Sequence, residues 1–375
     1  MKKFFALLLS LAMVLALVAC GQKDPTPDTP DTPDDPQTKV EYKVAMITDY
    51  GDITDQSFNQ TTYEACKAFA EDNSIEFSYF KPAGDNTADR VAMIEKAVND
   101  GFNVIVMPGY AFGGAIVEAA PEFPDVKFIA LDVAAGDLLE TAVAKAGEAY
   151  DYTPENWDLN KYVDMSNVYC AVYQEELCGY MAGYAAVKLG YKNLGFLGGM
   201  SVPAVVRYGY GFVQGVDAAA ADLGLTDVKL NYIYGGQFFG DADITAVMDT
   251  WYQGGTEVVF ACGGGIYTSA VDAAKKVNAK VIGVDVDQAG VIAKYAGVDG
   301  MTVTSAMKGL YPATYDTLTD VIVNGNWDKY VGKIATLGLV SGTDPEANYV
   351  QIPMGDGTQW SDSFTQDDYK AMVKD

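Results

Sequence analysis

Residues 101–120 read GFNVIVMPGYAFGGAIVEAA, and residues 255–274 read GTEVVFACGGGIYTSAVDAA. The two stretches align without a gap, and each runs from a short apolar segment through glycine into an amphipathic helical pattern. Their matches share one offset: Gly101/Gly255, Val104/Val258, Gly109/Gly263, Val117/Val271, Glu118/Asp272 and Ala119/Ala273. An apolar strand followed by a helix is the unit from which parallel α/β sheets are built.

The correspondence extends beyond these two stretches. Upstream, Asp89/Asp243, Ala92/Ala246 and Glu95/Asp249 keep the same offset. Downstream, after a slip of one residue, FIALDV starting at Phe128 aligns with VIGVDV starting at Val281, which pairs Asp132 with Asp285. Strands and helices share biased compositions and produce chance matches, but a nearly constant register over this span indicates an internal duplication.

The strand pattern predicts an α/β protein with two similar lobes, each a doubly wound parallel sheet flanked by helices. We expect lobe 1 to comprise residues 41–165 and about 305–330, and lobe 2 residues 166–304 and about 331–375. Three crossings between lobes are expected near residues 133–166, 303–309 and 326–335. The expected strands are Val44–Asp49, Ile75–Lys81, Asn103–Met107 and Lys127–Asp132, then Val168–Tyr173, Asn193–Leu197, Val228–Tyr234, Glu257–Cys262 and Lys280–Asp285.

Aspartates end three of these strands. Asp49, Asp132 and Asp285 are therefore expected at the carboxyl edges of the sheets, where open parallel sheets bind ligands. An aspartate at a strand end also serves as a turn or helix-capping residue. The matched positions of Asp132 and Asp285 favour a site in a cleft between the lobes.

Composition narrows the classes of function. The chain of 375 residues has no histidine, 51 acidic and 25 basic residues, and a formal net charge of −26. Without histidine there is no Ser-His-Asp triad, Cys-His pair or histidine-ligated metal. The acidic field disfavours binding to nucleic acid. We expect no enzyme activity, no cofactor and no metal site.

The first forty residues are predicted to be a secretory signal followed by a linker that tethers the protein. Lys2 and Lys3 precede an apolar run that ends in Leu-Val-Ala-Cys at Cys20, which is typical of a secretory signal and too short to span a membrane. This ending resembles a bacterial lipobox, which implies cleavage after residue 19 and lipidation of Cys20. Residues 20–40 are rich in Pro, Thr and Asp and predict a solvated linker. The protein is therefore expected on the extracytoplasmic face of the cell membrane, held by its lipid alone.

The other four cysteines, Cys66, Cys170, Cys178 and Cys262, lack metal-ligand spacing. They are expected to be small buried hydrophobic residues, although a disulfide is an alternative in an oxidising compartment.

Several short sequence motifs, spaced along the chain, resemble those of one family. Asp55-Gln56-Ser57-Phe58-Asn59 is similar to the Asp-Lys-Ser-Phe-Asn signature of the BMP family of basic membrane lipoproteins, the purine nucleoside receptors of the PnrA type. Further motifs resemble later conserved blocks of that family and occur in the same order. The resemblance extends from about residue 42 to 340. They are Gly198-Gly199-Met200 with Pro203, RYGYGFVQG, Gly263-Gly264-Gly265, Gly283-Val284-Asp285-Val286-Asp287-Gln288 and Thr304-Ser305-Ala306-Met307-Lys308.

The resemblance implies a type I periplasmic-binding-protein fold that delivers a nucleoside to the permease and ATPase of an ABC importer. It implies that Asp285 and Lys308 hold the ribose and that Gly264 lets the backbone approach the ligand. Phe58 and Asn59 belong to the first-lobe signature, with Asp132 at the matching strand end. Two positions depart from the family pattern: Gln56 replaces a basic residue, and Tyr208 replaces a phenylalanine.

The residue chemistry agrees with these implications. Phe58, Tyr208 and Phe238 or Phe239 offer aromatic faces on which a base stacks. A carboxylate such as Asp285 accepts hydrogen bonds from adjacent ribose hydroxyls, and Lys308 neutralises it. Asn59 offers a donor and an acceptor to a base edge. The alternatives are core packing for Phe58, Tyr208 and Phe238, and a solvated hinge position for Lys308.

The expected function is a monomeric substrate-binding lipoprotein whose lobes close over a small molecule. A ligand-sensing receptor of the same fold, a nucleoside-processing enzyme and an adhesive surface protein are the alternatives. Glu175 and Glu176 are expected to be solvated charges at a helix start.

Overall fold

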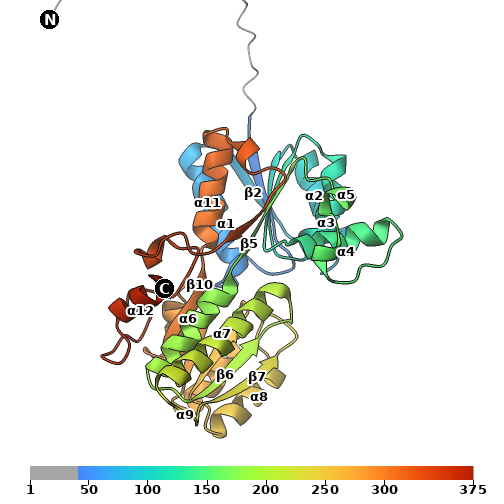
Figure 1. The fold of residues 1–375 in the computed structure, drawn as a ribbon. Helices are drawn as coiled ribbons and strands as arrows, with labels where there is room; N and C mark the ends of the chain where they lie inside the picture. The colour runs from blue at the N-terminus through green and yellow to red at the C-terminus, as the bar shows by residue number, and fades with distance from the viewer. Residues whose placement is uncertain (1–40, 375) are drawn as a thin grey trace, which may run out of the picture. The chain divides into compact units, whose positions relative to one another are not determined.

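The computed structural model describes residues 41–374, and from Tyr42 onward the described chain is one compact unit. The predicted signal segment, the linker and Cys20 lie outside the described residues. Figure 1 shows two sheets, each flanked by helices, in the upper and lower parts of this unit.

Each sheet has six strands, and the two sheets have the same order when read position by position. The first runs β2-β1-β3-β4-β5-β11 and the second β7-β6-β8-β9-β10-β12. All pairings are parallel except that of β10 with β12. The strands are β1 Lys43–Ile47, β2 Glu76–Phe80, β3 Val104–Pro108, β4 Lys127–Leu131, β5 Val168–Tyr173, β6 Asn193–Gly198, β7 Lys229–Tyr234, β8 Val258–Cys262, β9 Lys280–Asp285, β10 Thr302–Lys308, β11 Ile334–Leu337 and β12 Val350–Gln351.

Helices follow most strands, as the α/β pattern predicts. The central strands β3 and β8 are buried at every residue, because helices cover both faces of each sheet. The helices are α1 Phe58–Asn73, α2 Thr87–Asn99, α3 Phe112–Ala119, α4 Ala135–Lys145, α5 Leu159–Tyr162, α6 Glu175–Lys188, α7 Pro203–Asp222, α8 Ala242–Gln253, α9 Tyr267–Val277, α10 Ala289–Ala296, α11 Leu310–Leu318 and α12 Gln366–Lys374. The predicted α/β class with two lobes is confirmed.

The expected lobe boundaries need correction. Strand β5 was expected in lobe 2, but it pairs with β4 in the first sheet, and β11 pairs with β5 there too. The chain therefore passes between the sheets after β5, between β10 and α11, and between β11 and β12. The crossing expected near 303–309 is close to the second of these, whereas those expected near 133–166 and 326–335 come too early. An apolar parallel strand has the same sequence pattern in either sheet, so periodicity does not assign it.

The internal duplication is visible in the backbone. Strands β3 and β8 occupy equivalent positions, as do β4 and β9. The glycines that follow β3 and β8 both have positive φ, 125° at Gly109 and 151° at Gly263. Asp132 and Asp285 are also matched, with φ of 59° and 65°, a left-handed conformation that is uncommon for residues other than glycine. Equivalent strand ends thus place the two carboxylates in the same way.

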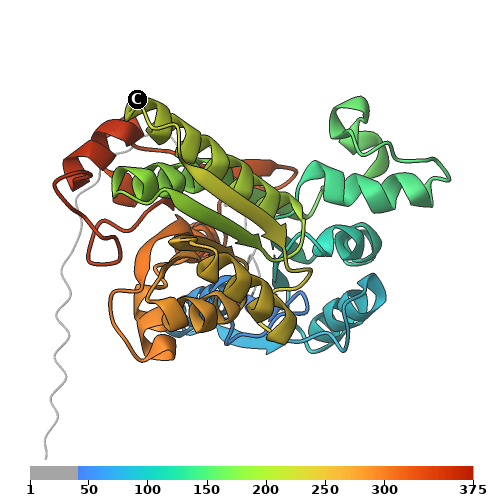
Figure 2. The same ribbon diagram turned by 90° about the horizontal axis from the view of Figure 1, so that it is seen from below.

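Helices α6 and α7 pack unusually closely, side by side in Figures 1 and 2. A Cβ added at Gly179 of α6 would lie 2.3 Å from the carbonyl oxygen of Tyr208, and one added at Gly211 of α7 would lie 1.8 Å from that of Glu176. Glycine is required at both positions because backbone atoms of the opposite helix occupy the space. This close contact fixes the N-terminal turns of the two helices relative to each other.

Gly211→Ala is therefore expected to destabilise the protein by about 1–3 kcal/mol or more, since the helices must separate to admit the methyl group. Chemical denaturation monitored by circular dichroism measures this change. Gly290→Ala is the matched control: no atom lies within 4 Å of its added Cβ, so the substitution should be neutral or stabilising. Equal stability of both variants would contradict the assigned packing.

Candidate functional site

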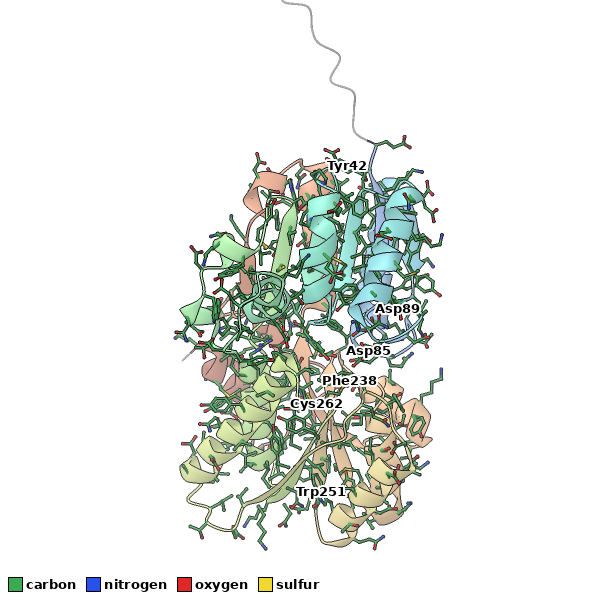
Figure 3. The ribbon with its side chains drawn as sticks, turned by 90° about the vertical axis from the view of Figure 1, so that its right-hand side faces the viewer. Tyr42, Asp85, Asp89, Phe238, Trp251 and Cys262 are labelled. Carbon is green, nitrogen blue, oxygen red and sulfur yellow. The ribbon has the colours of Figure 1, made fainter. Side chains whose placement is uncertain are left out.

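A cavity of about 380 Å³ opens where the carboxyl ends of strands from the two sheets meet. Its volume is in the range of sites for small molecules. Figure 3 shows Phe238 and Cys262 in the zone between the lobes. All nine ligand-binding residues expected from the sequence line this cavity: Asp49, Phe58, Asn59, Asp132, Tyr208, Phe238, Gly264, Asp285 and Lys308.

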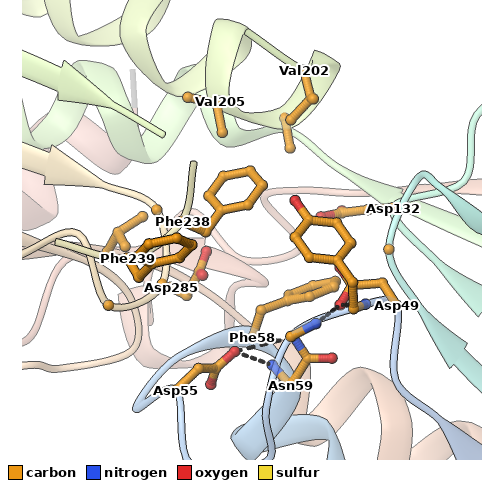
Figure 4. Close-up of a pocket in the computed structure, with 18 of the residues that line it drawn as sticks. Asp49, Asp55, Phe58, Asn59, Asp132, Val202, Val205, Phe238, Phe239 and Asp285 are labelled. Atoms are coloured by element: carbon orange, nitrogen blue, oxygen red, sulfur yellow. Dashed lines mark hydrogen bonds between the residues drawn. The ribbon is translucent and has the colours of Figure 1, made fainter. Parts of the chain in front are cut away.

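Asp55 holds the first turn of α1 in place, and this turn forms part of the first-lobe wall of the cavity. Its Oδ1 accepts from the backbone N–H groups of Ser57 and Gln60 at 2.9 and 3.1 Å, and its Oδ2 accepts from that of Asn59 at 3.0 Å. The carboxylate thus satisfies N–H groups that the first helical turn leaves unpaired. Phe58 and Asn59 then point from this turn into the cavity (Figure 4).

Asp49 follows β1 and is also held by the backbone. Its Oδ1 accepts from the N–H groups of Tyr50 and Gly51 at 2.6 and 2.7 Å. Burial raises the pKa of the carboxyl, and the two N–H groups oppose that shift because they stabilise the ionised form.

Lys308, the last residue of β10, lies at the centre of a buried charge cluster. Its Nζ lies 2.5 Å from Asp132 Oδ2, 3.3 Å from Glu175 Oε1 and 3.8 Å from Asp285 Oδ1. Its side chain is 3% exposed, so the alternative of a solvated hinge lysine is wrong. The nearby carboxylates raise the pKa of Lys308 against the opposing effect of burial. The ammonium also lies over the ring of Phe58, 4.6 Å from its centroid.

Glu175 corrects the sequence-based interpretation. We expected a solvated charge, but its side chain is fully buried at the start of α6. Its Oε2 accepts from Arg207 Nε at 2.6 Å, and its Oε1 accepts from Lys308. Burial raises the pKa of Glu175 to about 7, while Lys308 and Arg207 act in the opposite direction. The helix-start position was correct, but Glu175 contacts Lys308 and Arg207 in place of solvent, and the sequence did not indicate either pairing.

Asp285 joins the two lobes directly. Its Oδ1 accepts from the Tyr208 hydroxyl at 3.0 Å, and its Oδ2 accepts from the Ser57 hydroxyl of the first lobe at 2.5 Å. Tyr208 is 2% exposed, and this bond satisfies its buried hydroxyl group. Tyr208 is thus both a core residue and part of the cavity wall.

Aromatic rings form the apolar part of the cavity wall. Tyr50 stacks on Phe238 across the lobes, with centroids 6.3 Å apart and planes inclined by 29°. Phe239 is 61% exposed, which favours Phe238 of the two expected candidates. Figure 4 shows the second-lobe side chains Val202, Val205 and Phe238 opposite Phe58 and Asn59.

The glycine turn after β8 accommodates Phe238. A Cβ at Gly263 would lie 2.7 Å from Phe238 Cδ1, and one at Gly264 would lie 3.0 Å from the Phe238 carbonyl oxygen. Gly264 also has φ of 49°. Within the described chain, the close approach that needs these glycines is therefore that of Phe238.

Cys66, Cys170, Cys178 and Cys262 are free and buried, as expected for small hydrophobic residues. Among residues 41–374, no group of three or more His, Cys, Asp or Glu side chains is arranged to hold a metal ion. The helices within that range are too short or too polar to cross a membrane.

Sequence reasoning missed Tyr50, Arg207 and Glu175 as parts of the site and did not assign a contact to Ser57. Ser57 lies within the recognised Asp-Gln-Ser-Phe-Asn motif, so its place in the sequence could have indicated that it belongs to the site. Arg207 precedes Tyr208, but on a helix adjacent residues point in different directions, and its partner Glu175 is remote in sequence.

A cavity at the carboxyl edges of two pseudo-symmetric parallel sheets defines the two-lobed periplasmic-binding-protein class. Residues 42–343 match the model of the Bmp family, ABC transporter substrate-binding protein PnrA-like. The chain belongs to this family, which is one of substrate-binding proteins and not of enzymes.

Relatives and solved structures agree. The ABC transporter nucleoside-binding protein BmpA of Lactococcus lactis subsp. cremoris (strain MG1363) is 26% identical over 305 residues, 78% of this chain and 75% of that protein. Basic membrane protein B of Borreliella burgdorferi (strain B31) is 26% identical over 322 residues, 83% of each chain. An ABC transporter solute-binding protein from Aeropyrum pernix K1 superposes with a TM-score of 0.65 and 20% identity, covering 88% of this chain and 85% of that one. The structural likeness shows the shared fold.

The buried position of Glu175 predicts a pH-dependent stability. Its pKa is about 7 in the folded chain against 4.5 as the ordinary value, so the folded chain retains a proton that the unfolded chain releases between these values. Stability contributed by this group is full below about pH 4.5 and declines as the pH rises through about 7. In Glu175→Gln, the loss of stability between pH 4.5 and 7 should be smaller by about 1–3 kcal/mol.

Urea denaturation at a series of pH values measures this difference. Glu176→Gln, on the adjacent and only partly buried residue, is the matched control and should keep the pH dependence of the unaltered protein. A Glu175→Gln profile parallel to that of the control would contradict the assignment.

Proposed function

We propose that this ABC transporter substrate-binding protein captures a nucleoside, with a purine nucleoside favoured, in the cavity between its lobes. The observation that carries the proposal is the combination of aromatic rings and buried carboxylates in one cavity. Tyr50, Phe58 and Phe238 provide flat apolar surfaces for a base. Asp285 with Lys308 provides a charged pair for adjacent ribose hydroxyls.

The charges of the cavity favour a neutral ligand. Five carboxylates line it, Asp49, Asp52, Asp55, Asp132 and Asp285, against the two ammonium groups of Lys81 and Lys308. Lys81 is paired with Asp52 at 2.9 Å, and Lys308 is paired with Asp132. A phosphate would therefore meet an excess of negative charge and no unpaired cation. This supports a nucleoside and opposes a nucleotide.

The name of the Lactococcus lactis relative agrees with this ligand class. The departures at Gln56 and Tyr208 leave the proposed contacts in place. The Gln56 side chain bonds to Gln60 at 2.7 Å, and the Tyr208 hydroxyl bonds to Asp285.

We further propose that Cys20 carries a lipid and that residues 20–40 tether the binding unit to the extracytoplasmic face of the membrane. A relative from Pyrococcus abyssi (strain GE5 / Orsay), 26% identical over 320 residues, is named an uncharacterized lipoprotein. The protein acts as a monomer that presents its closed form to a permease with its ATPase. Loaded and empty proteins then differ in the population of the closed state.

A purine nucleoside is expected to raise the melting temperature of the protein after unfolding and refolding to remove bound ligand. A ligand at about 100 times its dissociation constant stabilises the folded state by about 2.7 kcal/mol. Asp285→Asn should weaken binding at least about tenfold, because the charged acceptor for the ribose hydroxyls is lost. Thermal unfolding and titration calorimetry with nucleosides, free bases and sugars measure both effects.

Asp287→Asn is the matched control for this experiment, because Asp287 is exposed and lies two residues from the cavity carboxylate. It should bind like the unaltered protein. Stabilisation by a sugar and by no nucleoside would overturn the ligand class while leaving the family intact.

A nucleoside monophosphate should bind at least about 100-fold more weakly than its nucleoside, since its charge meets buried and partly buried carboxylates without a free cation. Titration calorimetry at low and high salt measures the ratio. Comparable affinities, or tighter binding of the monophosphate, would be inconsistent with the proposed ligand.

A further inference from the structure

Glu175 lies where the chain crosses between the lobes and is not among the residues of the cavity wall. It is the first residue of α6, just after the chain leaves the first sheet at Tyr173. Its Oε1 accepts from the Nζ of Lys308 at 3.3 Å, and Lys308 is the last residue of β10, before the chain returns to the first lobe. One buried ion pair therefore connects two of the three crossings.

The third crossing is joined to the same place by backbone hydrogen bonds. The N–H group of Gln174, which precedes Glu175, donates to the Leu337 carbonyl oxygen at 2.9 Å. The N–H group of Gly309, which follows Lys308, donates to the Tyr349 carbonyl oxygen at 2.6 Å. The ion pair thus lies where the three crossings of the hinge meet.

The charges around this ion pair do not balance. The carboxylates of Asp132, Glu175 and Asp285 lie 2.5, 3.3 and 3.8 Å from Lys308 Nζ, and Arg207 Nε donates to Glu175 Oε2 at 2.6 Å. Two cations therefore face three carboxylates, none of whose side chains is more than 9% exposed. A buried excess of negative charge is costly, so this cluster binds a proton more readily than a solvated carboxylate does.

Glu175 is the member of the cluster that gains this proton, because burial raises its pKa to about 7. Two other carboxylates, those of Glu176 on α6 and Asp137 on α4, act on Arg207. The remaining titratable groups that face Glu175 have a pKa raised by burial and are neutral near pH 7: Tyr173 of β5, Cys178 of α6, Tyr208 of α7 and Cys262 of β8.

Asp132 is the one charged member of the cluster that belongs to the first lobe. It follows β4 of the first sheet, whereas Asp285 and Lys308 end β9 and β10 of the second. Helices α6 and α7, which carry Glu175 and Arg207, pack in the second-lobe core. Opening of the cleft moves Asp132 away with the first lobe and leaves two carboxylates with two cations. Closing restores the third carboxylate, whose negative charge raises the pKa of Glu175.

We propose that closing of the lobes takes up a proton at Glu175, so that a substrate is held more tightly in mildly acidic solution than in neutral or alkaline solution. The inference rests on the proposed closing of the lobes over a ligand and adds a proton to that step. The pKa of Glu175 is lower in the open form than in the closed form. Affinity is therefore highest below the open-form value, falls as the pH rises toward about 7, and is constant above it.

Titration calorimetry with adenosine, on protein freed of ligand by unfolding and refolding, counts the protons taken up. Adenosine has no group that titrates near neutral pH, so any uptake is due to the protein. At about pH 6.5, the apparent binding enthalpy should vary with the ionisation enthalpy of the buffer, with a slope of about half a proton taken up. The affinity at about pH 5.5 should exceed that at about pH 7.5 by about three- to tenfold. Binding without proton uptake would overturn the inference and leave the proposed function intact.

Variants assign the proton to its site. Glu175→Gln has no group to protonate, and Asp132→Asn removes the charge that closing adds, so both should lose the uptake. Glu176→Gln and Asp137→Asn, which remove one carboxylate each without touching the ion pair, should retain it. Uptake is read at saturation and so does not depend on how strongly a variant binds. Persistence of the uptake in a folded Glu175→Gln protein, checked by circular dichroism, would overturn the assignment. If that variant does not fold, the unaltered protein and Asp132→Asn decide.

The ligand-free protein separates failure of this inference from failure of the proposed function. If neither adenosine nor another purine nucleoside binds, the proposed ligand class is wrong, and small-angle X-ray scattering decides the inference. The radius of gyration should be smaller at about pH 5.5 than at about pH 7.5, because protonation favours the closed form. Equal radii at the two pH values would then overturn the inference.

Discussion

The buried ammonium of Lys308 is the interaction on which the arrangement of the cleft depends. It lies at the end of the second-lobe strand β10, just before the chain passes to α11, and contacts carboxylates from the first lobe, from the second lobe and from the start of α6. Each carboxylate would be costly to bury alone, and together they would repel one another. One cation makes their proximity tolerable and thereby holds two of the crossings and both strand-end aspartates in register.

The duplicated backbone explains how the carboxylates reach that cation. Strands β4 and β9 end in the same left-handed conformation, at Asp132 and Asp285, in equivalent places of the two sheets. The symmetry is broken at the next position, where β5 ends in Tyr173 and β10 ends in Lys308. The duplication gives the two sheets similar carboxyl edges. Because only β10 ends in a lysine, the cavity has one central ammonium group. The polar wall of Asp49, Asp55 and Asn59 belongs to the first lobe alone.

Much of the fold and of the cavity lining was predictable from the sequence. The features that were not predictable depend on contacts between residues that are remote in the chain. Nine of the twelve strands were predicted, because buried parallel strands are apolar runs, whereas β10, β11 and β12 were not. The cavity residues were predicted mainly from strand ends and from motifs such as Asp-Gln-Ser-Phe-Asn. The sheet that holds β5 was not predictable, because its pattern fits either sheet. Glu175 was misjudged for a related reason: its environment is set by Lys308 and Arg207, which are remote in sequence. The hydrogen bond from the Asn59 amide nitrogen to Asp55 Oδ2 likewise became visible only in the folded structure.

The contacts between the lobes bear on how binding is converted into a signal. Ser57 donates to Asp285 across the cleft, and Gln288 Nε2 donates to the backbone oxygen of Gln56 at 3.1 Å. Both bonds are made by the protein itself, so part of the free energy of closure does not come from the ligand. A ligand then shifts the equilibrium only by what it adds in the closed state.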